Sequence, residues 1–161
     1  MKLFFKEISS PVGKLKLVAN DKALVAILWE EEKIGRVRLT QMELSNKHPV
    51  LIDTETQLKE YFNGKRKTFD LRLDPIGTEF QNKVWRALRE IPFGETCSYG
   101  ELAKKLGSPK ASRAVGAANG KNPISIVVPC HRVIGQNGKL TGFAGGLDKK
   151  EILLKLENRS K

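Results

Sequence analysis

Cys130 and His131 stand side by side in the motif PCHRV, and their residue types are those of nucleophilic chemistry. A cysteine becomes a strong nucleophile as its thiolate, and a neighbouring base or cation lowers the pKa of the thiol. Adjacent residues in a bend need not touch through their side chains, so a water could relay the proton. A carboxylate must then orient the imidazole, and Glu157 is a candidate. The alternative is that Cys130 is a small buried hydrophobe and His131 a structural hydrogen-bonding residue.

The elements around this motif are predicted from periodicity and capping signals. Apolar residues recur at helical spacing over residues 78–91, and Phe80 is the first of them. A Ser-x-x-Glu capping box at Ser98 opens a second helix over residues 99–106. Near the C-terminus, Asp148 and a row of leucines predict the final helix, which carries Glu157.

A third helix is predicted where Ser108, as N-cap, is followed by Pro109 at the first helical position. Two short helices around a tight glycine turn are typical of a helix-turn-helix, although two packed helices without DNA give the same pattern. The second of the two, residues 111–119, is rich in Ala and Gly, and Arg113 is its one long charged side chain. That content is too poor for sequence readout and suits contact with phosphates or a shallow groove. Tight internal packing would explain the small residues equally well.

The charge of the chain indicates a polyanionic partner. Its 161 residues include 29 basic and 18 acidic ones, a net charge of +11. Residues 75–161 hold 15 basic and 7 acidic residues, net +8, whereas residues 1–74 have a net charge of +3. Lys and Arg that neutralise phosphates release counterions, so we expect a nucleic-acid footprint in the second half. A generic basic surface is the simpler alternative.

The first half is predicted to be a small α+β scaffold without chemical residues. Strands are expected over residues 2–8, 15–19, 23–29 and 68–73, with Phe69, Leu71 and Leu73 turned inward in the last. A capping box at Thr54 predicts a helix that ends at Gly64 and has Leu58, Tyr61 and Phe62 on one face. The segment from Asp74 to Gly77 marks the expected boundary between domains 1–74 and 75–161.

Other function classes are excluded by composition. No apolar run approaches the length of a membrane helix, and the charged N-terminus has no signal-peptide core, so a cytoplasmic protein is expected. Cys97 and Cys130 are the only cysteines, which is too few for a disulfide framework or structural zinc. We therefore expect no metal and no cofactor, and Cys97 is interpreted as buried packing.

The segment from Asn122 to Val133 closely resembles the active-site stretch of the O6-alkylguanine-DNA alkyltransferases, also called methylated-DNA–protein-cysteine methyltransferases. The resemblance covers about residues 75–157. Within this range the matching segments, besides residues 122–133, are residues 93–103, 112–116 and 142–147 and the helix from Lys150 to Glu157. Residues 1–74 are only loosely similar to the variable N-terminal domain of that family.

The resemblance implies direct DNA repair by an irreversible, single-turnover transfer of an alkyl group from O6 of guanine to Cys130. O4 of thymine is a second candidate position from which the alkyl group could be taken. By resemblance, His131 and Glu157 form a Cys–water–His–Glu network that generates the thiolate. Asn122 supports the surrounding turn, and Tyr99 protonates N3 of the leaving guanine.

The same resemblance implies contacts with double-stranded DNA that contains O6-alkylguanine, by a protein that is monomeric away from DNA. The target base is extruded from the duplex, and Arg113 fills the space it leaves. The implied DNA-contacting residues are Ser112, Arg113, Ala114, Gly116 and Asn119. The implied substrate pocket is formed by Val133, Phe143, Ala144, Gly145 and Gly146.

The expected fold class is α/β (α+β). The resemblance implies an N-terminal ribonuclease-H-like scaffold, followed by a mostly helical domain with a winged-helix-like helix-turn-helix. Two other functions stay open on the residues alone. One is a non-enzymatic DNA-binding module in which Cys130 is structural, and the other is a thiol hydrolase that uses Cys130 and His131.

Overall fold

Alternating hydrophobic residues near the N-terminus form a four-stranded sheet of order β3-β2-β1-β4. Its strands are β1 (Leu3–Ile8), β2 (Leu15–Ala19), β3 (Leu24–Trp29) and β4 (Met42–Leu44). The first three pair antiparallel and match the predicted ranges closely, whereas β4 lies parallel to β1. The pattern did not predict β4, because three residues on a sheet edge are too few to show alternation. The computed structural model describes residues 1–160.

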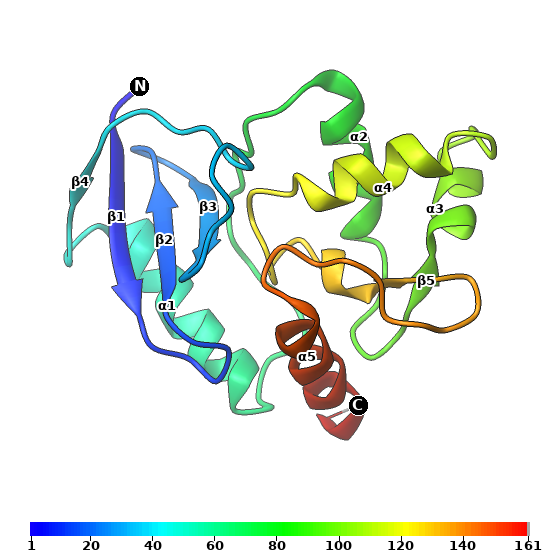
Figure 1. The fold of residues 1–161 in the computed structure, drawn as a ribbon. Coiled ribbons are helices and arrows are strands. Elements are labelled where there is room, and N and C mark those ends of the chain that lie inside the picture. Colours follow the sequence, from blue (N-terminus) through cyan, green and yellow to red (C-terminus); the bar gives the residue numbers. More distant parts are fainter. Residues whose placement is uncertain (161) are drawn as a thin grey trace.

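Helix α1 (Pro49–Phe62) covers one face of this sheet and lies against β1, β2 and β3 (Figure 1). The predicted start at Thr54 is wrong. The helix begins five residues earlier, since the side chain of His48 caps it by accepting a hydrogen bond from the amide of Val50. Thr54 lies inside the helix, where its hydroxyl donates to the Val50 carbonyl at 2.7 Å. Such back-bonding is a common use of threonine within helices.

The strand predicted over residues 68–73 is also wrong, although its inward pattern is confirmed. The segment makes only one isolated bridge, between Leu73 and Leu24 of β3. Phe69, Leu71 and Leu73 are partly buried against the core. The alternating apolar residues of this segment therefore indicated an extended chain that is buried on one side, and not a strand paired within a β-sheet.

The second half of the chain is mostly helical. Helix α2 (Glu79–Leu88) has the expected amphipathic face, except that Phe80 is exposed, and α3 (Tyr99–Lys105) begins at the predicted capping box on Ser98. Helix α4 (Ser112–Gly120) packs against α2 and α3. The N-cap predicted at Ser108 is wrong, because Ser108 accepts the amide of Ala111 in a turn and α4 begins only afterwards.

The reactive motif lies between these helices and the C-terminal one. Residues Cys130–Arg132 form a 3-10 turn, η1, which leads into β6 (Val133–Ile134). Strand β6 pairs in parallel with β5 (Cys97–Ser98). Helix α5 (Leu147–Ser160) then returns beneath η1, with Leu153 and Glu157 buried. Figure 1 shows α5 below the segment that carries η1, with the sheet on one side and α2 to α4 on the other.

One hydrophobic core crosses the expected boundary at residues 74–77. Buried side chains of β2, β3 and α1 belong to the same cluster as those of α2, α3 and α5. The edge strand β3 also holds the segment before the reactive motif, because the amide of Ile27 donates to the Pro123 carbonyl at 2.9 Å. The sheet therefore positions the chain that leads into η1.

Candidate active site

Cys130 begins η1 and is only 3% exposed. Burial raises the pKa of its thiol, while a hydrogen bond from Asn122 and the charges of Arg36 and Lys150 act in the opposite direction. Since the thiolate is the reactive form, a buried thiol of this kind needs a base to remove its proton. The surrounding cations lower the cost of the negative charge once it forms.

A tight, strained turn places Cys130. Asn122 is 1% exposed, donates through Nδ2 to the Val128 carbonyl at 2.9 Å and accepts the amide of Ile124 at 3.0 Å. Ile126 has φ of 77°, a conformation that costs a β-branched residue about 1–3 kcal/mol. The hydrogen bonds of Asn122 and the buried apolar neighbours hold the turn in this conformation.

His131, the residue after Cys130, forms a buried pair with Glu157. His131 is 0% and Glu157 1% exposed, and the imidazole Nε2 lies 2.6 Å from the carboxylate Oε2. Burial opposes ionisation of Glu157, but hydrogen bonds and charge from His131 and Arg132 lower its pKa to about 2. An ionised carboxylate can only accept, so Nε2 carries the proton. The other ring nitrogen, Nδ1, has no hydrogen-bond partner within residues 1–160.

Arg132 completes this cluster. Its Nε and Nη2 donate to the two oxygens of Glu157 at 2.8 and 3.1 Å, and its Nη1 donates to the Ile91 carbonyl at 2.6 Å. Burial lowers the pKa of His131, while Glu157 acts against that effect. The arrangement thus favours a neutral imidazole beside a charged carboxylate.

The interpretation that residues 1–74 contribute no chemical groups is wrong, because two polar side chains of this half contact residues of the candidate site. The hydroxyl of Tyr61, on α1, donates to Oε2 of Glu157 at 2.6 Å. Arg36 donates to the backbone carbonyl of Asn122 at 2.8 Å. Periodicity assigned Tyr61 to an apolar helix face, and nothing in the neighbouring residues indicated a polar partner 96 positions away.

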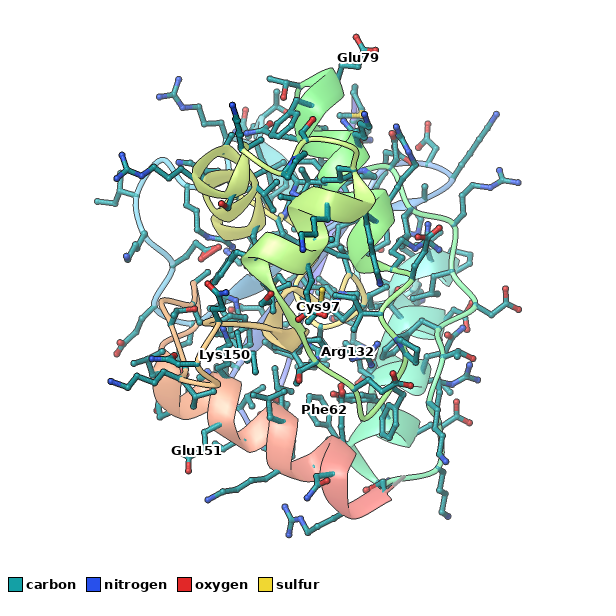
Figure 2. All side chains as sticks on the ribbon, turned by 90° about the vertical axis from the view of Figure 1, so that its right-hand side faces the viewer. Phe62, Glu79, Cys97, Arg132, Lys150 and Glu151 are labelled. Atoms are coloured by element: carbon teal, nitrogen blue, oxygen red, sulfur yellow. The ribbon has the colours of Figure 1, made fainter. Side chains whose placement is uncertain are left out.

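Lys150 is a further residue whose place the sequence did not indicate. It is 0% exposed, and its Nζ donates to the Val133 carbonyl at 2.6 Å. Burial lowers the pKa of this lysine, while the Cys130 thiolate would raise it. Lys150 and Arg132 are buried, whereas Glu151, the next residue of α5 after Lys150, is exposed; Figure 2 labels all three.

Tyr99 contacts the segment that follows β6. The hydroxyl of Tyr99 is 2.7 Å from that of Thr141. Phe143 packs edge-on against Trp29, with ring centroids 5.4 Å apart. Gly145 also faces Trp29, because a Cβ there would come within 2.7 Å of the indole. This close packing is a structural reason for glycine at position 145, in addition to the expected approach of its backbone to the substrate.

The candidate DNA-contacting residues on α4 do not share one surface. Arg113 and Ala114 are exposed, and Ser112 and Gly116 are half-buried. Asn119, by contrast, is 5% exposed and lies on the packed face, where its Oδ1 has no hydrogen-bond partner in the described residues. The DNA contact predicted for Asn119 therefore stays a prediction, and in this structure its side of α4 packs inward.

Cys97 lies in β5, directly across from Val133 of β6. It is 5% exposed, as the packing interpretation predicted. Burial raises the pKa of its thiol, and the nearby carboxylate of Glu101 raises it further. No group of three His, Cys, Asp or Glu side chains within residues 1–160 could hold a metal ion. Over the same residues, every helix is too short or too polar to cross a membrane.

Comparisons with known proteins agree with this arrangement. The profile of the 6-O-methylguanine DNA methyltransferase, ribonuclease-like domain, matches residues 3–75, and that of the DNA binding domain matches residues 79–159. The methylated-DNA–protein-cysteine methyltransferase of Methanosarcina acetivorans is 50% identical over 155 residues, which cover 96% of this chain and 98% of the relative. That of Mycobacterium tuberculosis H37Rv is 46% identical and covers 96% and 92%.

Solved structures support the same fold. A crystal structure of Mycobacterium tuberculosis OGT in complex with DNA has a TM-score of 0.90 and 45% identity, covering 98% of this chain and 94% of that one. The O6-methylguanine-DNA methyltransferase of Pyrococcus kodakaraensis, 22% identical over 96% of this chain and 98% of its own, has a TM-score of 0.55 and shows the shared fold. The predicted α/β class, with a helical second half, is confirmed.

Proposed function

This chain belongs to the 6-O-methylguanine DNA methyltransferase family, and we propose that Cys130 is the cysteine that receives the alkyl group. The predicted family and activity are confirmed: the protein repairs DNA by transferring an alkyl group from DNA to one of its own cysteines. The single observation that carries the choice of Cys130 is the buried pair of Glu157 and His131, the residue that follows Cys130 in η1.

In the proposed step, His131 takes the proton of Cys130 through a bridging water. The Sγ atom then attacks the alkyl carbon, the bond between that carbon and guanine O6 breaks, and a thioether forms. The guanine gains one proton from Tyr99, and the proton held by His131 returns to the Tyr99 phenolate through solvent, so that the step is balanced. A thioether is not cleaved by the same groups, so each molecule acts once. The charges of Arg36 and Lys150 stabilise the thiolate before the attack.

Tyr99 donates the proton to N3 of the leaving guanine, since a protonated base is the better leaving group. To do so its hydroxyl exchanges the contact with Thr141 for one with the base. The backbone of Val133 recognises the exocyclic amine, and the alkyl pocket is walled by Phe143, Ala144, Gly145 and Gly146.

The exposed part of α4 faces the DNA. Arg113 enters the duplex where the target base is extruded, while Ser112, Ala114 and Gly116 allow a close approach to the groove. The net charge of +8 in residues 75–161 supports a phosphate-dominated affinity that falls steeply with salt. We further propose that the protein is a monomer away from DNA and acts in the cytoplasm. In this proposal residues 1–74 form the scaffold domain and residues 75–161 form the DNA-binding alkyltransferase domain.

The test is intact mass after mixing the protein with duplex DNA that carries one O6-methylguanine. We expect a gain of one methylene per molecule, mapped to the Cys130 peptide, in the wild type and in Cys97→Ala. Cys130→Ala should show no gain. A methyl group on Cys97 would refute the assignment. Lesion binding without any covalent product would instead support a non-enzymatic sensor, and turnover on an acyl ester would support a thiol hydrolase.

A further inference from the structure

Glu157 collects hydrogen bonds from three separate parts of the chain. His131 and Arg132 donate from η1, the amide of Gly94 donates from the segment after α2, and Tyr61 donates from α1. The phenol, the imidazole and one Arg132 nitrogen all point to the same oxygen, Oε2. The first two lie 2.6 Å from it and the third 3.1 Å. A carboxylate oxygen has two lone pairs, so these donors share its negative charge.

The phenol of Tyr61 is held firmly in this position. Its side chain is 0% exposed, and its ring contacts three other aromatic rings. The centroids of Phe62, Phe69 and Phe93 lie 5.3, 5.4 and 6.1 Å away. The hydroxyl therefore cannot turn away from Glu157 without moving the core around it.

Tyr61 keeps its proton and remains a donor near neutral pH. Burial raises the pKa of its phenol far above the ordinary value, and the charge of Glu157 raises it further. Its hydrogen bond to Oε2 is thus permanent, unlike that of an imidazole that can change its protonation state.

Among the groups that face His131, the Glu157 carboxylate is the one that favours protonation of the imidazole. Burial, Arg132 beside it and Lys150 on α5 all lower the pKa of the imidazole. Glu157, also on α5, is the group that raises it, through its charge and its hydrogen bond. A further donor on Oε2 draws charge away from the imidazole proton, so the phenol on α1 weakens this effect.

We propose that Tyr61 is a positioning residue for the alkyl transfer. Its hydroxyl holds Oε2 of Glu157 so that His131 stays neutral, with Nε2–H on the carboxylate and Nδ1 open to the proton of Cys130. The inference rests on the proposed roles of Cys130, His131 and Glu157. Under this proposal α1, which lies in the half of the chain without the nucleophile, helps to keep His131 in the protonation state of a base.

The first test is the pH dependence of single-turnover methyl transfer in Tyr61→Phe. Without the phenol, Glu157 should hold the imidazole proton more strongly, so the acid limb of the rate profile should move up by about half a pH unit. That shift corresponds to a rate about three-fold lower on the acid side. The matched control is Thr54→Val, which removes one buried hydrogen bond of the same helix, to Val50, without touching Glu157. Its profile should match that of the wild type.

The second test needs no variant, because the chain has only two histidines. Imidazole nitrogen NMR of the wild type should show His131 neutral near pH 7 with the proton on Nε2. His48, which caps α1, serves as an internal reference. In Tyr61→Phe the titration of His131 should move upward.

An unshifted rate profile in Tyr61→Phe, with only the loss of stability that Thr54→Val also shows, would overturn the proposal. A wild-type spectrum with the proton of His131 on Nδ1 would overturn it too, even if Tyr61→Phe did not fold. Peptide mapping separates this failure from failure of the proposed function, in which the methyl group would not be found on Cys130.

Discussion

The two cysteines lie in neighbouring segments, yet their surroundings differ in charge. Cys97, in β5, sits across from the residue that follows η1, and Cys130 begins η1 itself. Both thiols are buried, and burial raises the pKa of each. Beside Cys97 stands the carboxylate of Glu101, which raises the pKa again, whereas Arg36 and Lys150 favour the thiolate of Cys130.

The comparison teaches that burial does not select the nucleophile. Burial disfavours the thiolate at both positions, so the difference comes from the fixed charges and from the availability of a base. His131 adjoins Cys130 and is paired with a buried carboxylate. The Cys97 thiol donates a 3.4 Å hydrogen bond to the Ser98 carbonyl, and the charges that act on its pKa are those of Glu101 and Lys105.

The largest expected effect comes from Glu157→Gln, which removes the charge that orients His131. The rate of methyl transfer should fall by about 100-fold or more, in the range of lost acid–base catalysis. Rapid-quench single-turnover kinetics on methylated duplex DNA would measure it. The matched control is Glu151→Gln on the same helix, an exposed carboxylate that pairs with Lys155. A wild-type rate in Glu157→Gln would make Cys130 independent of its base.

Lys150→Met should reduce the electrostatic difference between the two cysteines. Loss of the buried cation should raise the pKa of the Cys130 thiol and slow methyl transfer by about ten-fold, equivalent to about 1.4 kcal/mol. The pH dependence of iodoacetamide labelling, read by peptide mass, reports both thiols at once. Labelling of Cys97 should not change. Lys149→Met, the half-buried neighbour, is the control, and equal effects of the two changes would contradict this role for Lys150.

Glu157 should also be visible in the acid stability of the fold. Its pKa is about 2 in the folded protein and about 4.3 in an unfolded chain, so the folded state gains stability as the group ionises. That contribution is complete above about pH 4.3 and is lost as the pH falls toward 2. In urea unfolding, the free-energy difference between wild type and Glu157→Gln should therefore shrink across this window. A difference that stays constant with pH would refute the assignment.

The smallest expected effect is at Cys97. Glu101→Gln removes the nearby negative charge, so the pKa of the Cys97 thiol should fall and its labelling rate should rise about two-fold. Glutamine keeps the capping interaction with Ser98, since its side-chain oxygen can still accept the amide. The same iodoacetamide assay measures the change. A slower Cys97 in this variant would mean that Glu101 does not set its electrostatics.

Much of the local structure followed from the sequence because its causes lie within a few residues. The capping box at Ser98 and the start of β2 at Leu15 are confirmed, since each depends on neighbouring residues. The errors at Thr54 and Ser108 are of the opposite kind. In each case a competing local partner, His48 for α1 and the turn to Ala111 before α4, moved the start of the helix.

The sequence alone determined the reactive turn, the order of the helices and the candidate base and carboxylate. Only the tertiary structure decided which groups surround them. Tyr61 reaches Glu157 across 96 positions, and Arg36 reaches Asn122 across 86. Periodicity and caps are encoded over one or two turns of chain, whereas these contacts depend on how α1 and the sheet pack onto α5 and η1. A hydrophobic pattern shows that a side chain is buried, and packing decides which polar group its hydroxyl or guanidinium meets there.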